Sequence, residues 1–365
     1  MNITLIAGAR PNFMKIAPII KAIKLAQADG KNISYRLVHT GQHYDKKMSG
    51  DFFEQLGIPE PDINLECGGG SQAEQTAAIM VKFEKELQEN RPSVVLVVGD
   101  VTSTMACAIT AKKLCIDVVH VEAGIRSGDM TMPEEVNRIV TDSICDHFFT
   151  TSEIANTQLR RNGVEDCRIH FVGNTMIDTL YQNIHRIKKP EFWETYELDK
   201  KEYCLITLHR PSNVDDPEKL TAILSAITES SLGLPVIFPV HPRTRQTMDK
   251  YKISGKNILT IDPQGYLEFM YLIKHGKGVI TDSGGITEEA TVLNIPCLTL
   301  RNSTERPETV TIGTNELIGD DLLKLKLYVT KIMNGEWKKG QIPAFWDGNT
   351  SVRIIDILYS VYISK

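Results

Sequence analysis

Short apolar runs alternate with longer amphipathic stretches along almost the whole chain, and this alternation restricts the fold more than any other feature. Runs such as 94–98 and 278–280 have the length and the Val/Ile content of buried strands. Stretches such as 72–89 have the periodicity of helices that bury one face. Strands and helices in regular alternation predict an α/β fold, in which helices cover both faces of a parallel sheet.

The alternation stops between about 180 and 200 and then begins again. This pause predicts two doubly wound, Rossmann-like domains that face a cleft. We expect a first domain over 1–180, completed by a C-terminal helix over 350–365 that packs back on it, and a second domain over 200–349. The expected strands are 2–7, 34–39, 94–98, 118–121, 147–150, 169–172, 203–208, 236–240, 258–261, 278–281 and 296–300. The expected helices include 12–28, 72–89, 103–114, 135–145 and 153–162.

Composition narrows the environment and the partners. The chain has 365 residues and a formal net charge of −5, which gives no sign of a nucleic-acid surface. Its seven cysteines include no Cys-x-x-Cys pair, so we expect buried thiols in a reducing compartment. The first residues predict a strand and not a signal peptide, and no apolar run reaches the roughly 20 residues of a membrane span. We therefore expect a cytoplasmic protein.

Charged residues, titratable residues or glycines follow nearly every expected strand. Ligands of open α/β sheets bind outside the carboxyl ends of the strands, so these residues are expected to surround one site. A protein with only a structural role would have ordinary turn residues there, and the pattern instead predicts an enzyme. The strand-end segments are 8–11, 39–43, 99–100, 122–124, 209–210, 241–243 and 282–285.

The segment 281–290 carries the most specific signal for a ligand. A strand that breaks at Ser283-Gly284-Gly285 and then becomes helical presents free N–H groups and the positive end of a helix dipole, which suits a diphosphate. Glu289 follows one turn later, where its carboxylate would accept hydrogen bonds from a ribose. Arg306, in an Arg-rich loop, would neutralise the phosphates. The alternative is an ordinary strand–turn–helix with a glycine hinge.

Four titratable residues are candidates for proton transfer, and each has a structural alternative. Asp100 could instead cap a helix, Glu122 could form an ion pair with Arg126, and Glu134 could be part of a normal helix start. His209 could be a core histidine bonded to the backbone. Three carboxylates in a closed cleft would repel unless one kept a proton, which suits a reaction that needs a base and an acid.

Cations and aromatic residues complete the candidate site. Lys15 is either a substrate ligand on the first helix or a solvated surface lysine, and Phe269 either flanks a base or packs in the core. The sequence lacks Gly-x-Gly-x-x-Gly, a Walker A motif, Asp-x-Asp and a compact histidine cluster, so we expect no metal and no cofactor. The candidate cations are Arg10, Lys15, Arg210, Arg243 and Arg306.

As an ordered set, these motifs resemble the non-hydrolysing UDP-N-acetylglucosamine 2-epimerases from residue 1 to about 360. The resemblance implies a GT-B-like pair of domains, a homodimer, and interconversion of UDP-GlcNAc and UDP-ManNAc. The family reaction eliminates UDP to give 2-acetamidoglucal and then adds UDP back. The matching segments are 8–11 with Lys15, 41–43, 99–100, 120–126, 133–138, 208–210, 241–243, 281–290 and 304–308.

The resemblance also implies roles for individual residues. At the reacting sugar it places Asp100, Glu122, Glu134 and His209. At the diphosphate it places Arg10, Ser283, Gly284, Gly285 and Arg306, with Glu289 at the ribose and Phe269 near the uracil. Lys15 and His241 are expected among the other substrate-binding residues. A second-substrate region, which activates many bacterial members, is matched by Gln42, His43 and Arg210.

Several alternatives stay open from the sequence. The chain has Pro-Ser-Asn after Arg210 where Arg-Glu-Asn is usual in bacterial members, which leaves activation by a second substrate open. The segment 39–45 is similar to relatives that act on 2,3-diacetamido uronic acid nucleotides. A hydrolysing epimerase, a GT-B glycosyltransferase and a catalytically silent nucleotide-binding protein are further alternatives. Which carboxylate removes the C2 proton is not determined.

Overall fold

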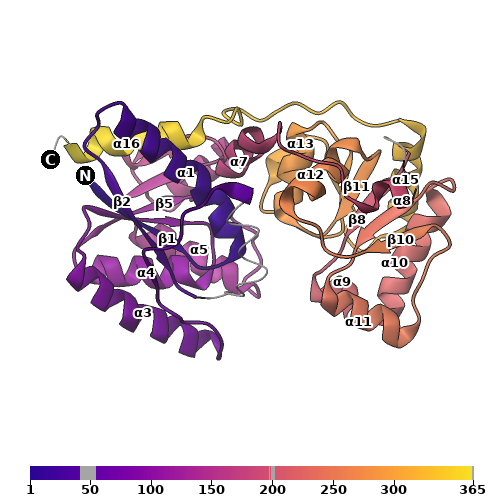
Figure 1. The fold of residues 1–365 in the computed structure, drawn as a ribbon, viewed down its shortest axis with the longest axis horizontal. Helices are drawn as coiled ribbons and strands as arrows, with labels where there is room; N and C mark the ends of the chain where they lie inside the picture. Colours follow the sequence, from indigo (N-terminus) through magenta and orange to yellow (C-terminus); the bar gives the residue numbers. More distant parts are fainter. Residues whose placement is uncertain (42–54, 197, 199–201, 364–365) are drawn as a thin grey trace. The chain divides into compact units, whose positions relative to one another are not determined.

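The computed structural model describes residues 1–41, 55–196, 198 and 202–363, which form two compact units (Figure 1). The first unit comprises Met1–Gln182 and Ala344–Lys365, and the second comprises Asn183–Pro343. Each unit is a parallel sheet in which helices connect most of the successive strands in the described part of the chain. The expected α/β fold class of two Rossmann-like domains is therefore confirmed.

The first unit contains a seven-stranded parallel sheet in the order β3-β2-β1-β4-β5-β6-β7. The order reverses between β1 and β4, which pair with Leu5 opposite Leu96. Its strands are β1 Asn2–Ala7, β2 Ser34–His39, β3 Ile63–Asn64, β4 Val94–Val98, β5 Asp117–Val121, β6 His147–Thr150 and β7 Ile169–Phe171. Its helices are α1 Arg10–Ala28, α3 Gln72–Glu89, α4 Thr102–Lys113, α5 Pro133–Ile144, α6 Glu153–Arg161, α7 Thr175–Asn183 and α16 Thr350–Ile363, with a short 3₁₀ turn η1 at Asp166–Arg168.

The central strand β4 shows why this sequence forms a doubly covered sheet. All five of its residues are buried. Val94, Leu96 and Val98 pack in the cluster that includes α1 and α16, whereas Val95 and Val97 pack in the cluster that includes α3 and α4. Successive strand residues point to opposite faces, so a continuous run of valine and leucine is required when helices cover both.

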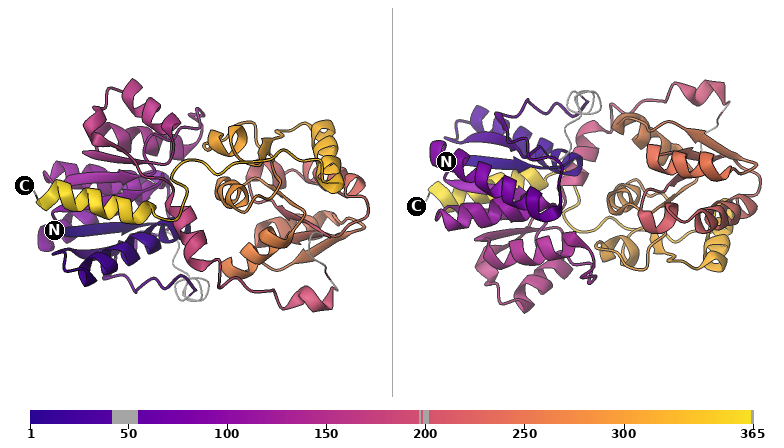
Figure 2. Two further views of the ribbon diagram at one scale, coloured as in Figure 1. Left: turned by 90° about the horizontal axis from the view of Figure 1, so that it is seen from above. Right: turned by 90° about the horizontal axis from the view of Figure 1, so that it is seen from below.

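The C-terminal helix α16 lies alongside α1, at the other end of the sequence (Figure 2). The carboxylate of Asp178 in α7 accepts hydrogen bonds from the backbone N–H groups of Thr350 and Ser351 and caps the start of α16. The indole of Trp346 is buried and donates to the Thr151 carbonyl at 3.0 Å. The last segment of the chain is thus an integral layer of the first unit.

The second unit contains a six-stranded parallel sheet in the order β10-β9-β8-β11-β12-β13, and its order reverses between β8 and β11. Thr207 and Thr281 pair at the ends of these two strands, with their hydroxyls 3.0 Å apart. Its strands are β8 Cys204–Thr207, β9 Val236–Pro239, β10 Ile258–Ile261, β11 Gly278–Thr281, β12 Cys297–Thr299 and β13 Asn315–Leu317. Its helices are α8 Phe192–Thr195, α9 Pro211–Val214, α10 Pro217–Ser230, α11 Pro242–Tyr251, α12 Tyr266–His275, α13 Gly284–Val292, α14 Pro307–Thr311 and α15 Leu322–Asn334.

The cysteines and the apolar character of the helices bear on the environment of the protein. The seven cysteines are free thiols, of which Cys115 and Cys167 are exposed. Among the described residues, no helix has both the length and the apolar character needed to cross a membrane.

Candidate active site

Both sheets place candidate residues where the strand order reverses, which is the ligand position in open α/β sheets. In the first unit, Asn12 fixes this position. Its side-chain oxygen accepts from the N–H groups of Gly8 and Ala9 after β1, and its amide nitrogen donates to the Val98 carbonyl at the end of β4. The loops after β1 and β4 are therefore held together by one buried side chain.

Glu122 follows β5 and forms an ion pair with Lys15 of α1, at 2.7 Å between Nζ and Oε2. Both side chains are largely buried, with 12% of Lys15 and 2% of Glu122 exposed. The alternative of a solvated Lys15 is therefore wrong. The alternative pairing of Glu122 with Arg126 is also wrong, because Arg126 binds Asp142 at 2.6 Å.

The backbone of Glu122 has φ +68°, in the left-handed region that side chains other than glycine rarely adopt. The N–H groups of Glu122 and Ala123 both point to the Phe149 carbonyl, which holds this turn. A strained residue of this kind typically needs about 1–3 kcal/mol from its surroundings and occurs often at functional sites. The strained backbone thus adds a structural reason to regard Glu122 as functional.

Asp100 follows β4 and does not cap α4, whose N-cap residue is Val101. The alternative that Asp100 is a helix cap is therefore wrong. Its carboxylate instead forms an ion pair with Arg138 of α5, and its backbone carbonyl accepts from the Asn137 amide at 2.9 Å. A Cβ added at the preceding Gly99 would lie 3.0 Å from Lys15 Nζ, so the Lys15–Glu122 pair lies close to the loop that carries Asp100.

The two adjacent acids at the start of α5 have different surroundings. Glu135 is buried, and its carboxylate accepts from the N–H of Ser127 at 2.8 Å, from the N–H of Gly128 and from Arg138. Burial raises the pKa of Glu135, but these hydrogen bonds outweigh it and hold that pKa below its ordinary value. Glu134 is partly exposed, and no group in the described part of the chain bonds its carboxylate. Glu135 thus holds the loop before α5, while Glu134 is available to a ligand.

In the second unit, α13 begins where the sequence predicts a phosphate cradle. Ser283 is the N-cap residue, and its hydroxyl makes no capping hydrogen bond. A Cβ at Gly284 would lie 3.8 Å from Glu305 Oε2 and 3.9 Å from Arg301 Nη1, whose bidentate ion pair therefore borders the start of the helix. Backbone N–H groups and a helix dipole at this start suit an anion.

His209 follows β8, and its ring is held by Asp282 at the end of β11. The Nδ1 atom lies 2.8 Å from Asp282 Oδ1, and Asp282 accepts from the N–H of Arg210 and from Asn213. Burial raises the pKa of Asp282, but the hydrogen bond and charge of His209 and the other donors lower it below its ordinary value. The His209 side chain is 52% exposed, so the alternative of a core histidine is wrong.

Two further acids of the second unit lie in low-dielectric surroundings. Burial raises the pKa of Glu289 in α13 to about 8, although a hydrogen bond from the Tyr266 hydroxyl at 3.1 Å opposes this shift. Burial also raises the pKa of Glu308 in α14 to about 7, against the charge of Arg306. Arg306 itself forms a buried ion pair with Glu288. A diphosphate that binds Arg306 would therefore compete with Glu288.

The remaining candidates have the following positions. Arg10 is the first residue of α1, and its side chain is outside the described part. Gln42 and His43 also lie outside the described residues. His241 is exposed and accepts from the N–H of Arg243 at the start of α11, whereas Phe269 lies partly buried in α12. Arg210 Nε donates to the Asp282 carbonyl, and Arg243 pairs with Asp215 at 2.6 Å.

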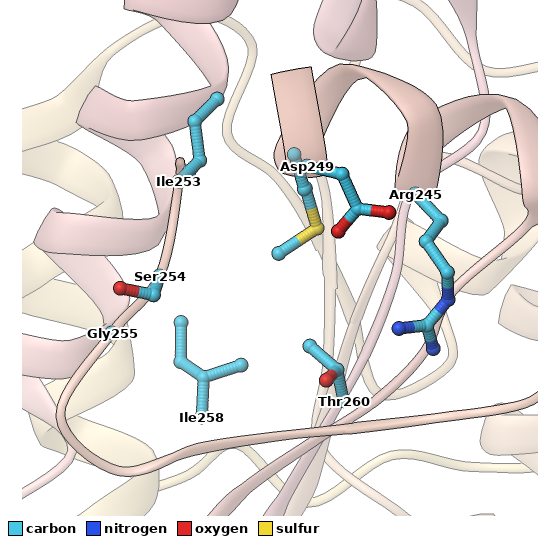
Figure 3. A pocket seen from close by; sticks show the side chains of 8 residues that line it. Arg245, Asp249, Ile253, Ser254, Gly255, Ile258 and Thr260 are labelled. Carbon is cyan, nitrogen blue, oxygen red and sulfur yellow. The ribbon is translucent and has the colours of Figure 1, made fainter. Parts of the chain in front are cut away.

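The described residues also form cavities away from these side chains. One of about 130 Å³ lies between the end of α11 and β10 and is lined by Arg245, Asp249 and Ile258 (Figure 3). It is smaller than the roughly 300 Å³ at which small-molecule sites begin. Another, of about 350 Å³, is lined by residues of α10, by the loop 318–321 and by the start of α15.

No group of three or more His, Cys, Asp or Glu within the described ranges is arranged to hold a metal ion.

Sequence reasoning missed the residues that orient the candidate acids. Arg138, Asn137 and Asp142 all lie on α5; the first two belong to the segment 133–138 that carries the family resemblance, and Asp142 lies beyond it. Arg138 and Asp142 are four residues apart, on neighbouring turns of one helix, and Asn137 is adjacent to Arg138. An amphipathic helix whose buried face is polar is the signal that could have found them, since buried polar groups need partners.

Two Rossmann-like units, each built on a parallel sheet with candidate site residues near the point where its strand order reverses, define the GT-B-like class. The model of the family described as UDP-N-acetylglucosamine 2-epimerase matches residues 25–359. The UDP-N-acetylglucosamine 2-epimerase of Methanocaldococcus jannaschii is 42% identical over 371 residues, covering 98% of this chain and 99% of the relative. The chain therefore belongs to the UDP-N-acetylglucosamine 2-epimerase family and is an isomerase.

Two other similarities bear on the substrate. A crystal structure of the M. jannaschii UDP-GlcNAc 2-epimerase in complex with UDP-GlcNAc and UDP has a TM-score of 0.86 at 41% identity, covering 99% of this chain and 100% of that chain. A UDP-2,3-diacetamido-2,3-dideoxy-D-glucuronate 2-epimerase of Pseudomonas aeruginosa is 40% identical over 322 residues, 87% of this chain and 88% of the relative.

Proposed function

We propose that the protein interconverts UDP-GlcNAc and UDP-ManNAc by eliminating UDP and adding it back. Family membership over nearly the full chain supports the reaction class. The observation that carries the mechanism is the set of acids at the ends of β4 and β5 and the start of α5, each in a different charge environment.

Proton transfer is assigned to the first unit. A carboxylate removes the C2 proton, the C–H electron pair forms the C1=C2 bond of 2-acetamidoglucal, and the C1–O bond breaks with its electron pair leaving on UDP. A proton then returns to the other face of C2 as UDP adds back. Asp100, Glu122 and Glu134 share these steps, with the first two kept in orientation by Arg138 and Lys15.

Nucleotide binding is assigned to the second unit. The start of α13 at Ser283, Gly284 and Gly285 receives the diphosphate, with charge from Arg306, and Glu289 receives the ribose. His209 supports the glycosyl oxygen or the leaving diphosphate. The other proposed contacts are made by Arg10, Lys15 and His241, by Phe269 at the uracil, and by Gln42, His43 and Arg210 at a second substrate.

The assembly and the location are also proposals. We propose a homodimer in the cytoplasm, because the family resemblance implies a dimer and because no described helix is suited to span a membrane. Sedimentation of the purified chain tests the dimer, and a single species with the mass of one chain would contradict it.

One observation supports an alternative substrate for the same reaction. The relative named for a 2,3-diacetamido glucuronate nucleotide is almost as similar to this chain as the M. jannaschii enzyme is. Epimerisation at C2 would be the same, but the substituents at C3 and C6 would differ. A panel with both sugar nucleotides decides between them.

The test is proton NMR in D2O with UDP-GlcNAc. We expect deuterium at C2 together with new signals of UDP-ManNAc, and no free ManNAc. Exchange without free sugar excludes a hydrolysing epimerase, and no exchange with any member of the panel would refute the proposal. Glu122→Gln and Glu134→Gln should abolish exchange and leave UDP binding intact, whereas Glu153→Gln, a change at an exposed residue of α6, should leave both intact.

A further inference from the structure

His120 is a fully buried histidine in β5 that the proposed mechanism does not use. Its Nδ1 lies 2.7 Å from Asp142 Oδ1, and its Nε2 lies 2.8 Å from the Gly99 carbonyl oxygen. Both distances are those of strong hydrogen bonds. The ring therefore bridges α5 and the loop after β4.

The two partners determine where the hydrogens are. A backbone carbonyl can only accept, so Nε2 must donate to Gly99. Asp142 Oδ2 already accepts from the N–H of Gly124 at 3.0 Å and from Arg126 at 2.6 Å, as an ionised carboxylate does. Nδ1 must then donate as well, which makes the ring an imidazolium.

Each end of this ion pair holds a turn that carries a candidate acid. Gly99, which accepts from His120, precedes Asp100 and has φ +66°. Gly124, which donates to Asp142, lies two residues after the strained Glu122 and has φ +78°. A Cβ at Gly124 would lie 2.4 Å from the Ala155 carbonyl, so this turn has little freedom to move.

We propose that His120, as a buried imidazolium, and Asp142 form a positioning pair that fixes the turns carrying Asp100 and Glu122. This inference rests on the proposed function for its catalytic consequence, but the state of the ring is independent of any substrate. Both side chains are buried, so we assign neither of them a contact with the sugar. Their effect is on the orientation of the acids, so it falls on kcat and not on substrate affinity.

The protonation of the ring is tested directly on the wild-type protein. Nitrogen-15 NMR of histidine-labelled protein at neutral pH, without substrate, should show hydrogen on both ring nitrogens of His120, assigned by its loss in a His120 variant. A bare Nδ1 or Nε2 would overturn the inference, even for a fully active enzyme.

Two substitutions separate the two hydrogen bonds. Glutamine places its amide nitrogen at about the reach of Nε2 and can keep the bond to Gly99, whereas asparagine reaches only about as far as Nδ1 and can keep the bond to Asp142. For both His120→Gln and His120→Asn we expect kcat for C2 exchange to fall about 10- to 100-fold, with KM and UDP affinity within about threefold. His147→Gln, which changes a histidine bonded to His170 on the next strands, is the matched control with unchanged kcat.

The outcomes distinguish this inference from the proposed function. Folded His120 variants with kcat within threefold of wild type would overturn the positioning role. Loss of UDP affinity in parallel with kcat would indicate general damage to the fold and would equally overturn it. Absence of exchange in the wild-type enzyme would refute the proposed function and the catalytic consequence together, even if both ring hydrogens are found.

Discussion

Replacing Glu289 with glutamine should stabilise the second unit at about pH 8.5 and leave its stability nearly unchanged at about pH 5. Glu289 is buried in α13, and burial raises its pKa from the ordinary 4.5 to about 8. Glutamine has the same shape, keeps an oxygen that can accept from the Tyr266 hydroxyl, and has no charge at any pH.

The magnitude follows from linkage between protonation and folding. Below the unfolded pKa the carboxyl is protonated in both states, so its contribution to stability is fully present. Between pH 4.5 and about 8 the unfolded chain releases the proton and the folded chain keeps it, so stability falls as pH rises. With about 1.4 kcal/mol for each pKa unit, the loss approaches about 5 kcal/mol, and Glu289→Gln should avoid most of it.

The assay is urea unfolding at the two pH values, with hydrogen exchange of peptides from β11 to β12 to localise the effect to the second unit. Glu288→Gln is the matched control on the neighbouring residue. It breaks the buried pair with Arg306 and should destabilise the unit by about 3–5 kcal/mol at both pH values. A Glu289→Gln protein that is equally destabilised at pH 5 and pH 8.5 would refute the reasoning.

Two further changes test the first unit. Lys15→Met keeps the apolar stem of the side chain but leaves the buried Glu122 carboxylate without its ammonium partner. We therefore expect the rate of C2 exchange to fall at least about 100-fold and the free energy of unfolding to fall by about 3 kcal/mol. A rate of exchange within threefold of wild type would contradict this. The His147 and His170 rings lie 3.1 Å apart, and burial together with the charge of His147 lowers the pKa of His170 to about 4. The unfolded chain therefore binds more protons below pH 6.5, and stability should fall by about 2 kcal/mol between pH 6.5 and pH 4, after allowance for partial solvent screening. His170→Phe should flatten this dependence in thermal unfolding, and an unchanged pH dependence would contradict the assignment.

The fold could be predicted where local signals are strong. The expected helix over 72–89 coincides with α3, where the Ser71 hydroxyl and the Glu74 carboxylate form a capping box. The strands Ile63–Asn64 and Asn315–Leu317 were not expected, and both lie at the edge of a sheet. They are only two and three residues long, so neither contains an apolar run that would identify it as a strand. Each is a strand because it pairs with its neighbour, β3 with β2 and β13 with β12.

The sequence predicts which acids lie at the site, but it does not predict which cations form ion pairs with them. The ends of parallel strands meet at one edge of a sheet, so sequence alone brings Asp100 and Glu122 near each other. Their cations depend on how helices pack across that edge. Arg126 is close to Glu122 in sequence, but Asp142 binds it, and Lys15 reaches Glu122 from a helix more than a hundred residues away. Short sequence separation therefore pointed to the wrong ion pair.

Two aspartate–histidine pairs among the described residues differ in burial, and this difference underlies the different roles proposed for them. In the first unit, the two ring nitrogens of His120 contact Asp142 on α5 and the Gly99 carbonyl after β4, so neither nitrogen is open to a ligand. In the second unit, Asp282 contacts only the Nδ1 atom of His209. Within the described residues, no group forms a hydrogen bond with Nε2 of this half-exposed ring. The same carboxylate–imidazole chemistry thus gives a fixed cation in one case and an oriented, accessible nitrogen in the other. Of these two histidines, we therefore propose His209 as the one that exchanges a proton with a departing diphosphate, because its Nε2 is the accessible second nitrogen.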